Sequence, residues 1–254
     1  MTDGVSLIVP VYNEERRLAA FVEEVASWVG GALSATHHLA EVVLIDDGST
    51  DSTADLLGPL RRHDRWCVVP SLGANVGKGD AVKRGVAAAS GSVVLFSDVD
   101  LAVPLGEATK LLDELDRGVA LAFGSRDLAG SDVTAPWQRA VAGKIFNLLV
   151  RGATGLGTRD TQCGFKAMRR ELAASLLSEQ LVPGLAFDVE LLLRARSGGH
   201  TTSEVPVRYV HGLDSQVQPL RHGARMATDV VRAAWLLRRA PGVTALADPD
   251  RGQG

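Results

Sequence analysis

Two carboxylates spaced two residues apart, Asp98 and Asp100, directly follow an apolar run at residues 92–96. The run is β-branched near its start, which predicts a short buried strand. A strand that ends there delivers both carboxylates to the carboxyl edge of a sheet, where open α/β sheets bind ligands. Paired carboxylate oxygens suit Mg²⁺ or Mn²⁺ shared with a substrate phosphate. The alternative is that both side chains are solvated in an ordinary turn.

The first apolar run, residues 5–9, is followed by side chains that suit a nucleoside ligand. It stops at Pro10, and Tyr12 and Glu14 come directly after it. A nucleoside diphosphate needs a wall for its base, an acceptor for its ribose hydroxyls and positive charge for its phosphates. Tyr12 offers an aromatic wall and Glu14 an acceptor for the ribose.

A second apolar run, residues 42–45, is followed by Asp46 and Asp47. The carboxylate of Asp47 can accept a hydrogen bond from the imide N–H of uracil. The alternative is that the two aspartates only cap the helix predicted over residues 52–62.

A glycine-rich turn follows, from Asn75 to Gly79, and it carries Lys78. A flexible backbone at a helix N-terminus together with one ammonium group suits an anionic ligand. The turn lacks the spacing of a Walker phosphate-binding loop. The alternative is a simple connection between a strand and a helix.

Strand-like and helix-like stretches alternate along the chain. Strands are predicted at residues 5–9, 42–45, 67–69, 93–96, 119–123 and 204–210. Helices are predicted at residues 14–29, 52–62, 79–89 and 105–115 and from residue 187 onward. Three successive βαβ units favour an α/β fold of one domain, residues 1–240, around a mostly parallel or mixed central sheet.

Composition narrows the function classes. The 254 residues carry 27 basic and 30 acidic side chains, and a net charge of −3 argues against binding of nucleic acid. The two cysteines, Cys67 and Cys163, lie far apart in the sequence, which favours a reducing compartment. No signal peptide is recognisable, and no apolar run approaches the ~20 residues that span a bilayer. We expect a cytoplasmic protein with a polar, disordered tail at residues 241–254.

In chain order, the motifs Pro-x-Tyr-Asn-Glu, Asp-Asp-Gly-Ser-Thr-Asp, Asn-x-Gly-Lys-Gly and Asp-x-Asp resemble those of inverting nucleotide-sugar glycosyltransferases with the GT-A fold. The resemblance covers residues 5–237. It implies that Asp100 is the main ligand of Mg²⁺ or Mn²⁺ and that Asp98 contacts the metal or the donor sugar. It also favours Asp47 over Asp46 as the residue that contacts the nucleotide base. The implied nucleotide-sugar site comprises Pro10, Tyr12, Glu14, Asp46, Asp47, Asn75, Lys78, Asp98 and Val99. The chain departs from the similar dolichol-phosphate mannose synthases at Ala102, where those enzymes have a glutamine.

The heptapeptide at residues 160–166 closely resembles a segment of dolichyl-phosphate β-glucosyltransferases. This resemblance implies transfer of glucose from UDP-glucose to a polyprenyl phosphate. Arg126 and Arg139 suit the acceptor phosphate, because guanidinium groups pair with phosphate oxygens in a planar fork; the alternative is that they form surface salt bridges. The implied catalytic residues are Asp98, Asp100, Arg126, Arg139, Asp160, Gln162 and Asp188.

Residues 218–240 contain five arginines and one acidic residue, and their spacing predicts a basic amphipathic helix. Such a helix can lie on an anionic membrane surface, which predicts peripheral contact with the cytoplasmic face of a membrane. The alternative is that it packs on the domain with its arginines in water.

Three alternative functions stay open at this point. The same fold can use GDP-mannose as donor, or it can glycosylate a soluble acceptor. A non-enzymatic nucleotide-sugar-binding protein is the third alternative.

Overall fold

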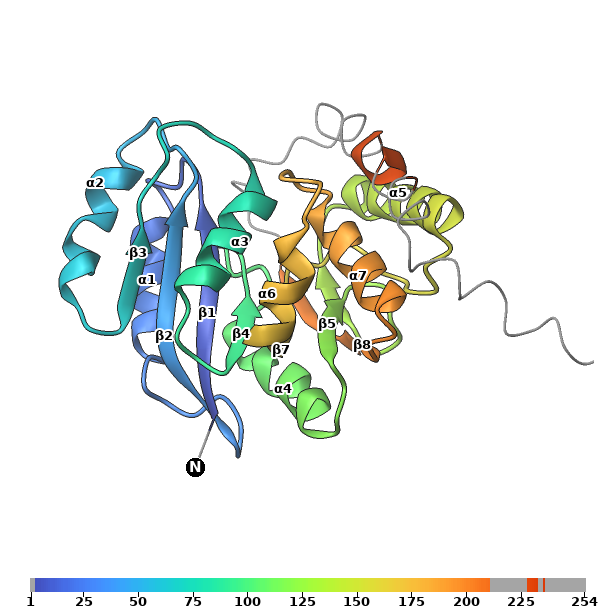
Figure 1. The fold of residues 1–254 in the computed structure, drawn as a ribbon, viewed down its shortest axis with the longest axis horizontal. Helices are drawn as coiled ribbons and strands as arrows, with labels where there is room; N and C mark the ends of the chain where they lie inside the picture. The colour runs from blue at the N-terminus through green and yellow to red at the C-terminus, as the bar shows by residue number, and fades with distance from the viewer. Residues whose placement is uncertain (1–2, 211–227, 233–234, 236–254) are drawn as a thin grey trace, which may run out of the picture.

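The structure is a computed structural model that describes residues 3–210, 228–232 and 235, with the backbone alone at residues 137–140 and 142. Within these residues, seven strands form one sheet in the order β3-β2-β1-β4-β7-β5-β8 (Figure 1). The strands are β1 (Asp3–Val11), β2 (His37–Asp46), β3 (Trp66–Val69), β4 (Val93–Phe96), β5 (Leu121–Ser125), β7 (Lys166–Arg169) and β8 (Thr202–Pro206).

The strand directions place the predicted site residues at one edge. β1 pairs in parallel with β2 on one side and with β4 on the other, so the chain reverses its direction of winding between β1 and β4. Ligands of open α/β sheets bind at such a switch point, beyond the carboxyl ends of the strands. β7 runs antiparallel to both β4 and β5. The segment that precedes β7 therefore reaches the same edge as the segment that follows β4.

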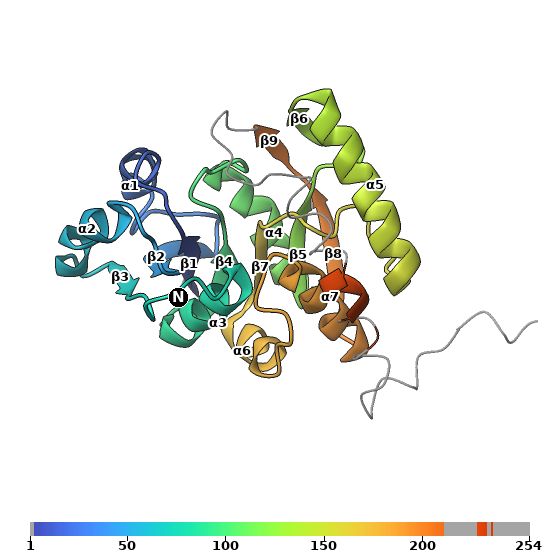
Figure 2. The same cartoon turned by 90° about the horizontal axis from the view of Figure 1, so that it is seen from above.

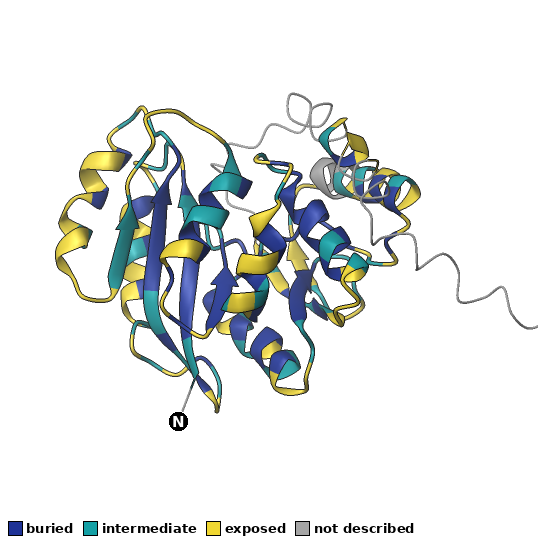
Figure 3. Cartoon of the chain, in the orientation of Figure 1, coloured by how far each residue is buried: buried dark blue, intermediate teal, exposed yellow. Residues whose placement is uncertain are grey.

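Helices cover both faces of the sheet, as Figure 2 shows from above. One face carries α1 (Leu18–Ala26) and α4 (Ala108–Asp116), and the other carries α3 (Lys78–Ala88), α6 (Arg170–Ser178) and α7 (Phe187–Ser197). Each face has its own cluster of buried apolar side chains. The central strands β1, β2, β4 and β5 are mostly buried, whereas the edge strands β3 and β8 are only partly buried (Figure 3). Burial on both faces explains the continuous apolar runs of the central strands.

Several predicted elements differ from the structure in their bounds. The predicted helix over residues 14–29 begins only at Leu18, because residues 14–17 form a turn. The predicted helix over residues 52–62 is split into α2 (Thr53–Leu57) and a 3-10 turn that starts at Pro59, which has no backbone N–H to donate. The predicted strand over residues 204–210 is divided into β8 and β9 (Arg208–Val210), which belong to different sheets.

The sequence pattern predicted no element between residues 124 and 186. The structure places there β6 (Asp132–Thr134), α5 (Trp137–Thr154), β7 and α6. β6 pairs in parallel with β9 in a small second sheet. In the described part of the chain, no helix is long and apolar enough to cross a bilayer. The predicted helix at residues 218–240 lies outside the described residues except for 228–232 and 235, and the predicted tail lies wholly outside them.

Candidate active site

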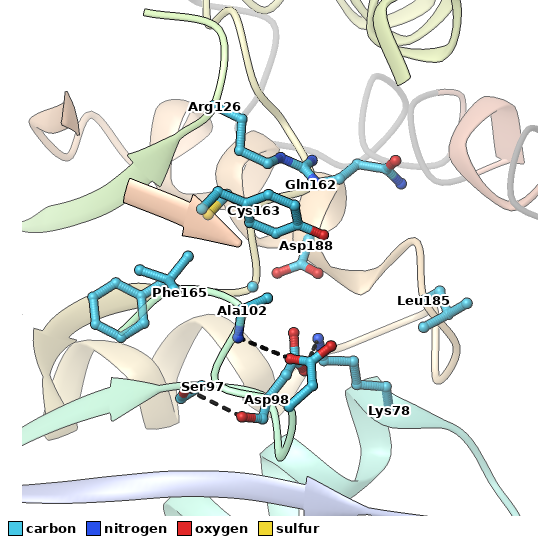
Figure 4. A pocket seen from close by; sticks show the side chains of 14 residues that line it. Lys78, Ser97, Asp98, Ala102, Arg126, Gln162, Cys163, Phe165, Leu185 and Asp188 are labelled. Atoms are coloured by element: carbon cyan, nitrogen blue, oxygen red, sulfur yellow. Dashed lines mark hydrogen bonds and ion pairs between the residues drawn. The ribbon is translucent and has the colours of Figure 1, made fainter. Parts of the chain in front are cut away.

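A pocket of about 230 Å³ opens at the edge where β4 ends and β7 begins (Figure 4). Its walls come from segments far apart in the sequence. It is lined by Lys78, Ser97, Asp98, Asp100, Ala102, Val103, Arg126, Gln162, Cys163, Gly164, Phe165, Leu185, Asp188 and Tyr209. Arg126 and Gln162 lie across the cavity from Asp98 and Lys78 in Figure 4. The pocket thus brings together six of the seven predicted catalytic residues: five line it, and Asp160 is buried behind it. The side chain of the seventh, Arg139, is not among those described.

Five of these residues line the cavity directly: Asp98, Asp100, Arg126, Gln162 and Asp188. Asp160 is the sixth, because it contacts Arg126 from behind the cavity wall.

The carboxylates of Asp98 and Asp100 leave β4 in a tight turn. The backbone N–H of Leu101 donates to the carbonyl of Asp98, and that of Ala102 donates to Oδ1 of Asp100 at 3.1 Å. Burial, and then the nearby charge of Asp98, raise the pKa of Asp100 above its usual 3.8. Two hard oxygen donors that repel each other fit a divalent cation, which would relieve that repulsion.

Lys78 is the first residue of α3 and faces the same carboxylates. Its Nζ lies 2.6 Å from Oδ1 of Asp98. Burial alone would lower the pKa of Lys78, but the carboxylates of Asp98 and Asp188 raise it, so the ammonium group stays charged. The pocket therefore combines a fixed positive charge with the positive end of the α3 dipole.

On the opposite wall, Arg126 is held by Asp160. Its Nε and Nη2 donate to the two carboxylate oxygens at 2.6 and 2.9 Å. The Asp160 side chain is fully buried, whereas 30% of the Arg126 side chain is exposed. The guanidinium also lies 5.3 Å from the ring centroid of Tyr209. Asp160 therefore positions Arg126 at the pocket through a largely buried ion pair, which differs from the surface salt bridge considered as the alternative. Contact between Arg126 and an acceptor phosphate stays a prediction.

Gln162 follows Asp160 and lines the pocket itself. Its backbone N–H donates to Oδ1 of Asp160 at 3.1 Å. Among the described residues, its Nε2 is buried without a hydrogen-bond partner. A buried donor of this kind carries a desolvation cost unless a ligand pairs with it, so Gln162 is suited to bind substrate.

Asp188, a predicted site residue, forms a buried ion pair with Lys166. Lys166 was not among the predicted site residues. The two side chains meet at 2.6 Å with 5% and 0% of their surfaces exposed. Asp188 therefore has a structural partner although it also lines the pocket. Next to this pair, Cys163 is buried, and burial raises the pKa of its thiol to about 11, which argues against Cys163 as a nucleophile.

The residues after β1 lie beside the pocket, outside its lining. Tyr12 is 40% exposed. Both carboxylate oxygens of Glu14 accept hydrogen bonds from Arg17, at 2.6 and 2.7 Å. Arg17 in turn lies 3.8 Å from Asp100. Arg17 and Tyr209 are thus two residues at the site that sequence reasoning missed, since neither belongs to a recognised motif.

The aspartates after β2 hold local backbone. Asp46 Oδ1 accepts from the N–H of Ser49 at 2.9 Å. The two oxygens of Asp47 accept from the N–H groups of Val76 and Gly77, at 3.0 and 2.9 Å. Asp47 therefore fixes the turn that leads into α3 and Lys78. Contact between Asp47 and a base stays a prediction.

The remaining predicted nucleotide-sugar residues are placed differently from one another. Pro10 is half-buried in β1, and Asn75 is exposed in the turn before α3. The side chain of Val99 is buried in the core cluster on the α1 and α4 face. Only the backbone of Val99 is therefore available to a ligand.

Comparison with known proteins agrees with this geometry. Residues 6–177 match the profile of glycosyl transferase family 2. The chain is 35% identical over 237 residues to a dolichyl-phosphate β-glucosyltransferase of Drosophila melanogaster, covering 89% of this chain and 73% of that protein. It is 31% identical over 238 residues to the Dictyostelium discoideum protein of the same name, covering 90% and 73%.

Among solved structures, the fold is similar to a glucosyl-3-phosphoglycerate synthase from Mycobacterium tuberculosis in complex with Mn²⁺, UDP and phosphoglyceric acid. The TM-score is 0.66 and the sequence identity 25%, and the match covers 94% of this chain and 80% of that one. The predicted GT-A fold and glycosyltransferase activity are confirmed by these matches. The chain therefore belongs to glycosyl transferase family 2.

Proposed function

We propose that this glycosyltransferase transfers glucose from UDP-glucose to a polyprenyl phosphate, with inversion at the sugar carbon. The observation that carries the proposal is the pocket, in which a carboxylate pair faces Arg126 across one cavity. That arrangement offers a place for a donor diphosphate at one wall and for an acceptor phosphate at the other. The names of the two relatives, at 35% and 31% identity, support the sugar and the acceptor.

Asp98 and Asp100 are the residues that would hold Mg²⁺ or Mn²⁺. Among the described residues, no three His, Cys, Asp or Glu side chains are grouped so that they could hold a metal ion. Mg²⁺ is commonly bound by one or two carboxylates together with water and substrate phosphates. When bound, the cation supplies Lewis-acid stabilisation of the leaving nucleoside diphosphate. The Mn²⁺ and UDP in the similar synthase structure support this assignment.

On the donor side, Lys78 and the N-terminus of α3 supply positive charge for the diphosphate. Tyr12, Glu14 and Asp47 lie toward the nucleoside end, at the carboxyl ends of β1 and β2. Because Asp47 fixes the turn before Lys78, it also sets where that ammonium group stands.

On the acceptor side, Asp160 fixes the plane of the Arg126 guanidinium, which then orients the acceptor phosphate. A phosphate monoester is already largely ionised at neutral pH, so its oxygen needs no strong general base. Asp188 is engaged by Lys166 and has no such role in this proposal. Positioning and charge compensation then supply most of the rate.

We further propose that the enzyme works as a peripheral protein at the cytoplasmic face of a membrane. The two described cysteines are both free, which suits a reducing compartment. The basic segment at residues 218–240 is one candidate for membrane contact on sequence grounds.

The test is transfer of labelled sugar into the organic phase. Purified protein is given UDP-glucose or GDP-mannose, detergent-dispersed polyprenyl phosphate, and Mn²⁺, Mg²⁺ or a chelator. Lipid labelling from UDP-glucose that the chelator abolishes is the expected result. Labelling from GDP-mannose alone would overturn the choice of donor.

A soluble phosphorylated acceptor is the second candidate. It is favoured by the phosphoglyceric acid in the similar synthase structure. In the same assay it predicts UDP release with a small phosphorylated acceptor and no labelled lipid.

A further inference from the structure

The outward face of α5 is apolar and uncovered within the described part of the structure. Four of its apolar side chains are about half exposed or more. They are Val141 at 47%, Ile145 at 56%, Leu148 at 68% and Leu149 at 61%. With about 100° of rotation per residue, these four fall within a stripe about 100° wide. A contiguous exposed apolar stripe of this kind is typical of an interaction site.

Charge narrows the choice of partner. The 18 residues of α5 include three basic side chains, Arg139, Lys144 and Arg151, and no acidic one. Lys144 and Arg151 are exposed and fall on one flank of the apolar stripe by the same helical spacing. An exposed apolar stripe with a basic flank fits the headgroup region of an anionic lipid bilayer. A second copy of the chain would instead bring like charges together, with no acid on α5 to pair with them.

The opposite face of α5 is joined to the pocket. Asn147 is buried, and its Oδ1 accepts hydrogen bonds from the Oγ1 and backbone N–H of Thr161, at 2.8 and 3.3 Å. Thr161 lies between Asp160, which holds Arg126, and Gln162, which lines the pocket. One helix therefore presents an apolar stripe to the outside and holds the acceptor wall of the pocket from behind. Figure 2 shows α5 on the β8 side of the sheet, at the end far from β3.

We propose that the outward face of α5 docks on an anionic membrane surface and so brings the acceptor wall to the lipid phosphate. This inference rests on the proposed function, because only a lipid acceptor requires the pocket to lie close to a bilayer. The docking itself is measured without any turnover.

The experiment is flotation of the full chain with vesicles. One set contains phosphatidylcholine with about one-third phosphatidylglycerol, and the other contains phosphatidylcholine alone. The double variant Leu148→Gln/Leu149→Gln removes apolar contact, and Lys144→Gln/Arg151→Gln removes charge. Leu72→Gln is the matched control, because Leu72 is 70% exposed and lies outside α5.

We expect the parent and the Leu72 variant to float with anionic vesicles. The Leu148/Leu149 variant should lose at least about tenfold in partitioning, and the Lys144/Arg151 variant should lose its preference for anionic vesicles. An unchanged melting temperature and UDP affinity show that the variants are folded. Equal flotation of parent and Leu148/Leu149 variant overturns the proposal. So does a dimer in light scattering that the Leu148/Leu149 variant abolishes, because a second copy then covers this face.

The two proposals fail in different ways. Vesicle binding by the parent without lipid labelling in detergent supports the docking surface and defeats the proposed acceptor. Lipid labelling in detergent without vesicle binding overturns the docking surface and leaves the proposed function standing.

Discussion

Replacing Asp160 by asparagine tests whether this buried carboxylate positions the acceptor wall. Oδ1 of Asp160 accepts from Nη2 of Arg126 at 2.9 Å and from the N–H of Gln162 at 3.1 Å. Oδ2 accepts from Nε and the backbone N–H of Arg126 at 2.6 and 3.1 Å. All four partners are donors. Asparagine keeps the shape but has only one acceptor oxygen, so its amide NH₂ group would face two donors.

The size of the effect follows from the burial of the pair. Removing one partner of a buried ion pair costs about 3–5 kcal/mol of unfolding free energy. Because 30% of the Arg126 side chain is exposed to water, we expect the low end, about 3 kcal/mol. For a chain of this length, that loss lowers the melting temperature by roughly 6–12 °C.

The assay compares urea unfolding and steady-state kinetics of the parent and Asp160→Asn. Asp132→Asn is the control, because Asp132 is an exposed carboxylate on β6, and it should change stability by no more than about 0.5 kcal/mol. We expect Asp160→Asn also to raise the KM for the acceptor more than that for UDP-glucose, since Arg126 loses its orientation. A stability within about 1 kcal/mol of the parent, with an unchanged acceptor KM, would refute the reasoning.

The same pair predicts a pH dependence. Burial alone would raise the pKa of Asp160, but the charge of Arg126 and the hydrogen bonds hold it below its usual 3.8. A carboxyl group with a lowered pKa in the folded state contributes stability above its unfolded pKa and loses it as the pH falls through the folded pKa. The stability difference between parent and Asp160→Asn should therefore stay constant from neutral pH down to about 5 and shrink below about 4. Urea midpoints measured across this range check the prediction.

Three further substitutions probe the pocket and its support. Asp100→Asn should lower kcat by about 10²–10³ and weaken the dependence on added Mn²⁺, which initial rates at saturating substrates will show. Gly164→Ala would place a Cβ 2.7 Å from Oδ2 of Asp98. We expect at least about tenfold lower activity, because the Asp98 carboxylate has to move. The melting temperature should be nearly unchanged, because the atom that the Cβ meets is at the end of a movable side chain. Asp188→Ala leaves Lys166 buried without its carboxylate and should cost about 3–5 kcal/mol. Adding Lys166→Met to that variant should restore part of the lost stability, as measured by thermal unfolding. If no stability is restored, the broken ion pair is not the cause of the loss.

Local sequence determined the elements whose signals are local. The strand at residues 93–96 was predicted with the bounds that the structure has, and the helix at Phe187 was predicted with its observed start. An apolar, β-branched run that stops at polar residues is enough to define a buried strand. The order of such strands also placed Asp98 and Asp100 at the carboxyl edge, because parallel strands end on the same side of a sheet.

Several features of the fold could not be predicted in this way. The sequence pattern predicted neither α5 nor the antiparallel strand β7, whose four residues pair with β4 and β5. Pairing between strands depends on neighbours that are distant in sequence, and a short strand carries little pattern of its own.

The sequence by itself determined the family motifs, the fold class and the kinds of side chain at the site. Only the tertiary structure decided which charged side chains pair: Asp160 forms an ion pair with Arg126, 34 residues away, and Asp188 forms one with Lys166. It also decided that the apolar stripe of α5 faces outward while Asn147 faces inward, where it accepts a hydrogen bond from Thr161. The physical reason is that the role of a carboxylate or an apolar stripe depends on burial and on its partners, and long-range packing sets both.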